Sequence, residues 1–175
     1  MSHKWLFLPV FVLGLLCAAA GTEAQDRDSR DGARSLLGSW MVTATSATFS
    51  VCNGPSIPAP PPFTELVTYT AGGGFLETNS HLNWNLGPLS STLVANASDG
   101  FGTWKGTEGG VKLKFRKMLF DAKGTYIANV DISEVVASER DDRFSGTFAL
   151  SFNFLDGSAP LCATGNVIGV AIRPE

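Results

Sequence analysis

Residues 143–154 read Arg-Phe-Ser-Gly-Thr-Phe-Ala-Leu-Ser-Phe-Asn-Phe, and this stretch decides the fold class of the chain. Side chains of a β-strand point alternately to its two faces. Here one face collects Phe144, Phe148, Leu150, Phe152 and Phe154, and the other collects Ser145, Thr147, Ser151 and Asn153. The pattern predicts a strand that lies with one face on a core and the other in water.

The same alternation recurs from Leu37 onward, and no amphipathic helix pattern of useful length interrupts it. Glycine, proline, aspartate and asparagine separate the segments, and they supply the conformations that tight turns need. The predicted strands are residues 38–52, 63–70, 74–80, 100–107, 110–121, 125–138, 143–154 and 161–173. Eight strands with mostly short links predict an all-β fold, an eight-stranded antiparallel up-and-down β-barrel. A β-sandwich is the competing architecture.

The N-terminus has the features of an export signal. Lys4 precedes an apolar run from Trp5 to Ala20, and small residues follow it. This order is typical of a secretory signal peptide, which we assign to residues 1–24, with cleavage after Ala20 or Ala24. The protein is therefore expected to be secreted or periplasmic, without a stable membrane anchor after cleavage. A lipid anchor on Cys17 and an uncleaved anchor are the minor alternatives.

The rest of the chain divides into a linker and one domain. Residues 25–36 are mostly charged and alternate in sign, which predicts a flexible linker. Residues 37–175 are long enough for one β-barrel domain with its own core.

Charge and motif content exclude several classes of function. The formal net charge of the chain is −3, and no block of lysine and arginine occurs, which argues against nucleic-acid binding. His81 is the only histidine beyond the signal peptide, so we expect no metal site and no Ser-His-Asp triad. Phosphate loops and dinucleotide fingerprints are absent from the sequence, and we expect no cofactor.

Two cysteines remain after signal cleavage, Cys52 and Cys162, and in an exported protein they most simply form one disulfide. In a closed eight-stranded meander the first and last strands are antiparallel neighbours. Placing Cys52 opposite Cys162 then pairs apolar residues along both strands: Trp40 with Pro174, Val42 with Ile172, and Ala44 with Val170.

This topology puts both long loops, residues 53–62 and 81–99, at the Cys52 end of the barrel. The second loop carries Trp84 and several leucines. Long apolar loops on a compact domain are more often functional than mere connections, so this end is the predicted mouth.

The first strand opens with Leu37-Gly38-Ser39-Trp40. This Gly-x-Trp start, in an exported eight-stranded barrel of this length, resembles the lipocalins and the wider calycin group. The resemblance implies that Trp40 packs at the closed floor of the barrel and that Arg173 lies across it. The Thr-Asp-Tyr motif of the lipocalins is replaced by residues 139–143, so the chain resembles an outlying, bacterial-type member. Allene-oxide-cyclase and dirigent-type barrels are similar in size and strand count.

Aromatic residues on the apolar strand faces form the candidate ligand-binding set. Phe115, Phe148 and Phe152 would line a lumen, with Tyr69 and Tyr126 as polar groups that orient a ligand. The set also includes Phe75 and Trp84. The alternative is a solid core without a cavity.

Glu65 and Glu77 form the second candidate set, because their strands are predicted hairpin partners. If both face the lumen, burial and mutual repulsion would raise at least one pKa and suit it to proton transfer. The alternative is that both side chains point into water.

Three functions follow from these observations. The first is a lipocalin-like barrel that binds a small apolar molecule in its lumen, as a monomer or homodimer. The second is a cofactor-free cyclase or isomerase that uses Glu65 or Glu77. The third is a structural or interaction module, which predicts a packed lumen and an exposed apolar patch.

Overall fold

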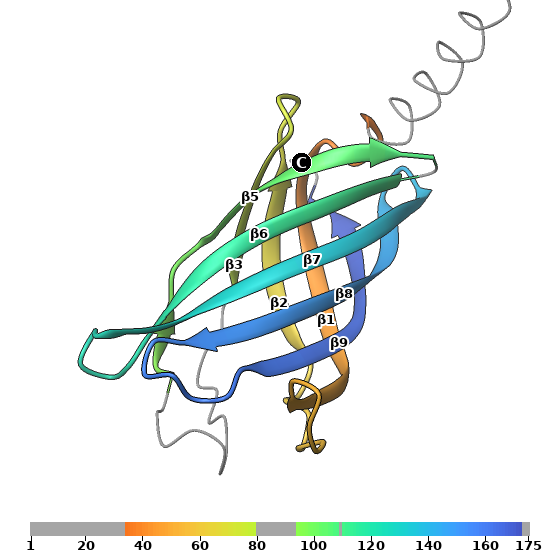
Figure 1. Ribbon diagram of the computed structural model, residues 1–175. Coiled ribbons are helices and arrows are strands. Elements are labelled where there is room, and N and C mark those ends of the chain that lie inside the picture. Colours follow the sequence, from red (N-terminus) through yellow and green to blue (C-terminus); the bar gives the residue numbers. More distant parts are fainter. Residues whose placement is uncertain (1–33, 80–93, 109, 173–175) are drawn as a thin grey trace, which may run out of the picture.

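The computed structural model describes residues 34–79, 94–108 and 110–172, and these form a closed antiparallel β-barrel (Figure 1). Its strands are β1 (Gly38–Val51), β2 (Phe63–Tyr69), β3 (Gly74–Asn79), β4 (Asn96–Ala97), β5 (Gly100–Thr107), β6 (Gly110–Phe120), β7 (Tyr126–Arg140), β8 (Arg143–Phe154) and β9 (Leu161–Ala171). The stretch that predicted the fold, residues 143–154, coincides with β8.

Closure of the barrel follows from the strand pairing. Strand β1 pairs with both β2 and β9, and β6 pairs with both β5 and β7, so eight strands complete a ring. Every pairing is antiparallel, which confirms the predicted all-β up-and-down barrel over a sandwich. The short β4 was not predicted. It pairs with the end of β6 just beyond β5, as a continuation of β5 across an irregularity at residues 98–99.

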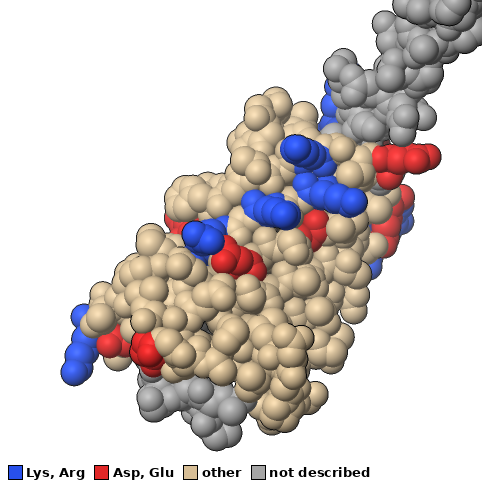
Figure 2. All heavy atoms as spheres, viewed as in Figure 1, with Lys and Arg blue, Asp and Glu red and all other residues tan. Residues whose placement is uncertain are grey.

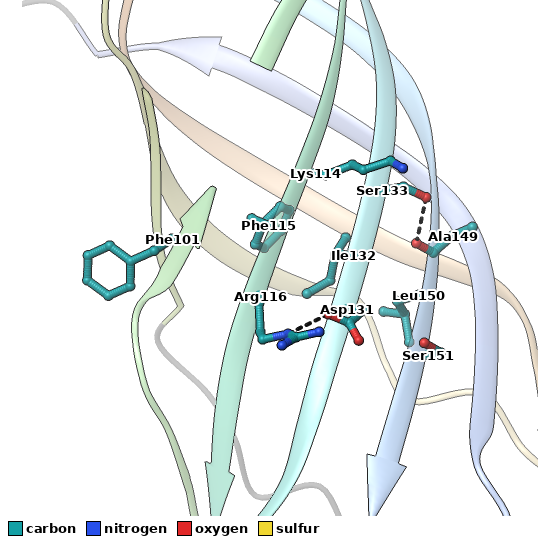
Figure 3. Close-up of a pocket in the computed structure, with 10 residues that line it drawn as sticks. All are labelled: Phe101, Lys114, Phe115, Arg116, Asp131, Ile132, Ser133, Ala149, Leu150 and Ser151. Atoms are coloured by element: carbon teal, nitrogen blue, oxygen red, sulfur yellow. Dashed lines mark hydrogen bonds and ion pairs between the residues drawn. The ribbon is translucent and has the colours of Figure 1, made fainter. Parts of the chain in front are cut away.

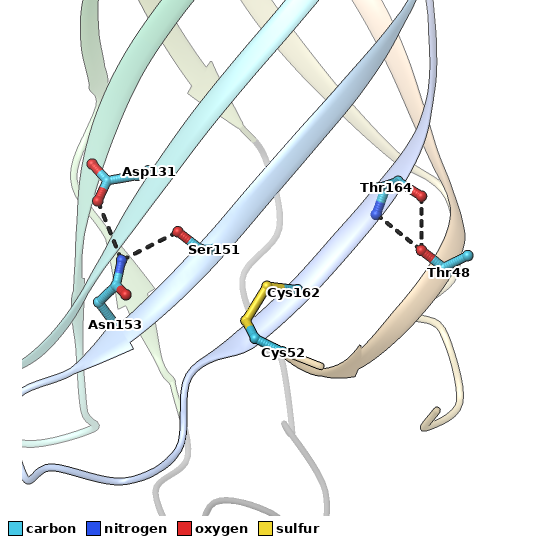
Figure 4. Close-up of a disulfide and its surroundings, with 7 residues drawn as sticks. All are labelled: Thr48, Cys52, Asp131, Ser151, Asn153, Cys162 and Thr164. Atoms are coloured by element: carbon cyan, nitrogen blue, oxygen red, sulfur yellow. Dashed lines mark hydrogen bonds between the residues drawn. A yellow bond between two sulfur atoms is a disulfide. The ribbon is translucent and has the colours of Figure 1, made fainter. Parts of the chain in front are cut away.

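The disulfide between Cys52 and Cys162 is present, and it ties the end of β1 to the start of β9 (Figure 4). The predicted register between these strands is wrong. Residue Cys162 lies opposite Ser50, because Cys52 is just beyond the end of β1 and bridges diagonally. Nearby, the hydroxyls of Thr48 and Thr164 are 2.7 Å apart and strengthen the same seam.

A bulge in β1 accounts for the rest of the register error. Trp40, Val42 and Ala44 lie opposite Ala171, Gly169 and Val167, and the pairing shifts between Ser46 and Thr48. An inserted residue changes which positions face the core. Inward residues of β1 are therefore even-numbered before the bulge, and Phe49 is the inward residue beyond it. Val170 and Ile172, expected to face Ala44 and Val42, are 44% and 47% exposed instead.

One end of the barrel is closed by aromatic rings. Trp40 is buried, its ring meets the Phe144 ring edge-on at 5.0 Å, and its Nε1 donates a hydrogen bond to the carbonyl oxygen of Leu36. Tyr69 packs against Phe75, Trp104 and Phe144 in the same layer. This aromatic floor is where the resemblance to lipocalins placed Trp40. Its expected partner, Arg173, lies outside the described residues.

Glycines on β9 make room for two of the inward phenylalanines. Phe144 lies opposite Gly169, and Phe148 lies opposite Gly165. A Cβ at either glycine would collide with the phenyl ring across from it. The rings thus cover bare backbone of the neighbouring strand, which packs the narrow lumen without voids at those points.

Charged side chains lie mainly on the outer surface. Lys112, Lys114 and Arg116 are exposed along β6, because they take the outward positions in the alternation of that strand. Lys105 on β5 lies opposite Lys112. Figure 2 shows lysine and arginine side chains gathered over this part of the surface, with acidic side chains beside them.

Candidate functional site in the barrel lumen

Four ionisable side chains project into the apolar interior: Glu65 from β2, Glu77 from β3, Lys117 from β6 and Glu134 from β7. All four are buried, with exposures between 0% and 7%. Each takes an inward position in the alternation of its strand. These four residues are the lumen cluster.

Glu77 and Lys117 form the ion pair at the centre of the lumen cluster. The Lys117 Nζ donates a 2.8 Å hydrogen bond to Oε1 of Glu77 and lies 2.7 Å from Oε2. Gly100 on β5 lies opposite Glu77, and a Cβ there would come within 2.6 Å of Oε2. The missing side chain at Gly100 therefore leaves the space that the carboxylate occupies.

Glu65 lies beside this pair, and its surroundings favour its neutral form. It lies opposite Asn79, one inward position along from the pair of Val67 and Glu77. Burial raises the pKa of Glu65 well above its usual range, and the charges of Glu134 and Glu77 raise it further. A hydrogen bond between the Glu65 and Glu77 carboxyls acts in the same direction, because it favours a proton on Glu65.

Burial and neighbouring groups shift the pKa of Glu77 in opposite directions. Burial raises the pKa of its carboxyl, whereas the charge and hydrogen bond of Lys117 and the hydrogen bond with Glu65 lower it. Two neighbours thus stabilise the ionised form of Glu77, so this is the carboxyl of the lumen cluster best placed to carry negative charge.

Glu134 is the third carboxyl, and it lies between Leu113 on β6 and Phe148 on β8. Burial in this apolar setting, together with the charge of Glu77, raises the pKa of Glu134 from 4.5 to about 8. Its carboxyl is thus largely protonated near neutral pH and titrates in the physiological range. Burial also raises the pKa of the nearby Tyr69 phenol, followed by the charges of Glu134 and Glu65.

A cavity of about 40 Å³ adjoins the lumen cluster. All four members of the lumen cluster line it, and so do three aromatic residues, Phe63, Phe115 and Phe148. The other lining residues are Ala44, Leu119, Val130, Ile132 and Leu150. This volume is enough for two or three water-sized groups. Ordinary ligand pockets of several hundred Å³ are far larger.

The residues predicted to bind a ligand are not all brought together. Phe115 and Phe148 line the cavity, whereas Tyr69 and Phe75 belong to the aromatic floor, and Phe152 packs edge-on against Phe49. The expectation that Tyr126 faces the lumen is wrong. It is 36% exposed at the start of β7 and packs on Phe120, because the first residues of β7 lie at the rim of the barrel. Trp84 lies outside the described residues.

Both carboxyls singled out from the sequence, Glu65 and Glu77, face the lumen rather than water. Sequence reasoning missed Lys117 and Glu134. The signal was there, since Lys117 falls in the alternation of Leu113, Phe115 and Leu119, and Glu134 in that of Val130, Ile132 and Val136. A charged residue at an apolar position of a period-2 pattern is the mark of a buried charge.

A second hollow lies on the outer surface over β5 to β8, with a volume of about 650 Å³ (Figure 3). Phe101 on its border is 66% exposed, and Arg116 and Asp131 form a 2.6 Å ion pair across it. The charges of Arg116 and Asp131 are solvated and neutralise one another. This open hollow therefore offers a ligand fewer specific contacts than the lumen cluster does.

No protein-family model matches this chain, and no curated protein matches it either. Over the described residues no helix is long and apolar enough to cross a membrane. Within the same residues, no group of three or more histidine, cysteine, aspartate or glutamate side chains is arranged to hold a metal ion.

Proposed function

We propose that this protein is an exported barrel that binds a small molecule in its lumen, through the lumen cluster and the cavity beside it. The observation that carries the proposal is the burial of three carboxyls and one ammonium in an otherwise apolar interior. The polar part of the ligand contacts the lumen cluster, and its apolar part lies against Phe63, Leu119 and Val130.

Stability does not explain why the chain keeps these four residues. Removing charges from water costs several kcal/mol per ion. Replacing a buried ion pair with apolar residues of similar volume therefore often leaves stability unchanged or increases it. Within the part of the chain that the structure describes, Glu65 and Glu134 have no positive partner of their own. Ionisable groups with shifted pKa values beside a cavity are typical of binding and catalytic sites.

The size of the cavity defines the kind of ligand. It fits a small polar group better than the larger, purely apolar molecule that the aromatic residues alone suggested. Export is supported by the Cys52–Cys162 disulfide, which persists in oxidising compartments, and by the apolar N-terminal segment with its small-residue exit. The lipocalin-like relationship is supported by the closed barrel and by Trp40 in its floor.

A binding screen on the oxidised domain tests the proposal. Amide signals of β2, β6 and β7 are followed by NMR against small molecules with amine, hydroxyl, carbonyl and carboxylate groups. The matched variant is Ala44→Val, since Ala44 lines the cavity and the added methyl groups would fill it. We expect shifts in the wild type that disappear in Ala44→Val. If no compound shifts the signals around the cavity, the proposed function is wrong.

Proton-transfer catalysis by a cofactor-free isomerase or cyclase is the second candidate. It is favoured by the pKa of Glu134 at about 8, because a general acid or base works best when its pKa lies near the operating pH. Glu65 and Glu77 would then hold or relay the proton. Exchange of deuterium from solvent into a small ketone that binds the lumen is the assay. The wild type should catalyse this exchange and Glu134→Gln should not; equal rates exclude the candidate.

A further inference from the structure

The lumen cluster has an excess of acidic groups. Three carboxyls and a single ammonium are the buried charged side chains of the described residues. Lys117 is committed to Glu77, whose two carboxylate oxygens lie 2.8 and 2.7 Å from its Nζ. Glu65 is engaged with the same carboxylate through its hydrogen bond. Within the described lumen, no positive group is left for the third carboxyl.

That third carboxyl is Glu134, which is 7% exposed and reaches the cavity. It makes no hydrogen bond and no ion pair within the described residues. Among the described residues, the one fully buried side-chain oxygen without a hydrogen bond is Oε2 of Glu77, so the Glu134 oxygens are not sealed in the core but meet the cavity. A carboxyl in an apolar lumen without a protein partner usually marks a site that something else completes. The space in front of Glu134 is therefore a place where a hydrogen-bond donor is needed.

We propose that the cavity receives the protonated amine of a small organic molecule, which forms an ion pair with Glu134. This inference rests on the proposed function and names the chemical class of its ligand. An ammonium group supplies the donors that Glu134 lacks and becomes its counterion once that carboxyl ionises. An anionic ligand would lie near the ionised Glu77 and would find no free cation within the described lumen, because Lys117 is paired with Glu77.

The volume of the cavity sets the size of the group that binds. About 40 Å³ holds two or three water-sized groups, which matches a terminal methylene-ammonium unit. The cavity is partly open, so the remaining carbons of the ligand would extend out of it past Phe63, Leu119 and Val130. A primary alkylamine of about four carbons satisfies both requirements, and ligands of this size bind with dissociation constants of roughly 10 µM to a few mM.

Binding of an amine also displaces a proton from Glu134. An alkylammonium has a pKa near that of lysine, so it enters the lumen already protonated. The carboxyl O–H bond of Glu134 breaks, its proton passes to the buffer, and the carboxylate pairs with the ligand. The ionisable groups around Glu134 in the lumen are Glu65 and Tyr69 on β2, Glu77 on β3 and Lys117 on the neighbouring strand β6. Burial raises the pKa of Glu65 and of Tyr69, which favours their protonated forms, and Glu77 keeps Lys117 as its partner.

Isothermal titration with n-butylammonium, n-butanol and butyrate tests the inference, because the three probes share one chain and differ in the terminal group. We expect butylammonium to bind at least tenfold more tightly than the other two. Its binding should release close to one proton near pH 6.5, measured by comparing buffers of different ionisation enthalpy. Its affinity should rise about tenfold per pH unit up to about pH 8.

Glu134→Gln is the variant that removes the proposed partner, and Glu139→Gln is its matched control. Glu139 is on the same strand, but its side chain is exposed and pairs with Arg143 at 3.0 Å. Glu134→Gln should weaken butylammonium binding at least tenfold at about pH 7.5 and abolish proton release, whereas Glu139→Gln should change neither. If Glu134→Gln does not fold, proton release and pH dependence of the wild type decide the matter.

The outcomes separate this inference from the function on which it rests. Tighter binding of butanol or butyrate, or amine binding without proton release, overturns the assignment of an amine and leaves lumen binding standing. Binding of none of the three probes overturns the amine assignment. If the broader screen with the Ala44→Val control also fails, lumen binding fails with it.

Discussion

Replacing Glu134 with glutamine should make the protein more stable, and the gain should grow with pH. Glu134 has a usual pKa of 4.5 in the unfolded chain and a pKa of about 8 in the folded barrel. The folded state therefore keeps a proton that the unfolded state loses. The contribution of Glu134 to the free energy of unfolding is therefore fully present below about pH 4.5 and is lost as the pH rises towards 8. Glutamine has the same shape and does not titrate.

The size of the effect follows from the two pKa values. Each unit of difference corresponds to about 1.4 kcal/mol, so between about pH 5.5 and pH 8 the wild type should lose about 3 kcal/mol through Glu134 alone. The advantage of Glu134→Gln over the wild type should increase by this amount over the same range. Glu65 and Glu77, whose pKa values are also raised by burial, add to the slope of both proteins. Because the charge of Glu134 also raises the pKa of Glu65, Glu134→Gln should reduce the Glu65 contribution as well, which adds to the difference between the two proteins.

Urea unfolding of the oxidised protein, followed by tryptophan fluorescence, to which the buried Trp40 contributes, measures the free energy of unfolding at each pH. Glu139→Gln is the control, and its profile should run parallel to that of the wild type. A parallel profile for Glu134→Gln as well would refute the reasoning. It would mean that Glu134 is ionised in the folded barrel or solvated through a path into the lumen.

Three further changes test other parts of the structure by the same unfolding assay. Lys117→Met should lower the free energy of unfolding by about 3–5 kcal/mol near pH 8, because it leaves Glu77 buried without its cation. Adding Glu77→Gln should restore much of this loss, and equal instability of the single and double variants would contradict the reasoning. Reducing the disulfide, which spans 110 residues, should cost about 4–5 kcal/mol, and an unchanged urea midpoint would show that it adds no constraint. Gly169→Ala should lower the free energy of unfolding by about 1–3 kcal/mol, because the added Cβ would collide with the Phe144 ring. Gly72→Ala should be near neutral, because a Cβ there has no atom within 4 Å. Similar losses for both variants would argue against the packing of the Phe144 ring over Gly169.

The fold was predictable because period-2 patterning acts locally. Residues 143–154 alternate without interruption, and the structure shows β8 over the same range. The register of β1 on β9 was not predictable, since it depends on the bulge between Ser46 and Thr48. The sequence of residues 45–48, Thr-Ser-Ala-Thr, contains no signal that predicts an inserted residue. The two-residue β4 depends in the same way on its pairing with β6.

The candidate site was half predictable for a different reason. Glu65 and Glu77 belong to one hairpin, so their proximity followed from neighbouring strands. Lys117 and Glu134 reach them only because the barrel closes and brings β6 and β7 across the lumen from β2 and β3. Their inward positions were readable from the alternation of each strand. Their partners were not, because contacts across a lumen leave no pattern along the chain.

The pairing of β1 with β9 has a consequence for how the barrel is assembled. Seven of the eight seams join strands that follow one another around the meander, whereas this seam joins the two ends of the domain. During synthesis, β1 keeps one free hydrogen-bonding edge until β9 has been made, and the most recently made strand exposes another. The nascent chain is thus most open to wrong strand pairing just before its last segment emerges. Because Cys162 is part of that segment, its disulfide with Cys52 can form only once β9 is available to close the ring.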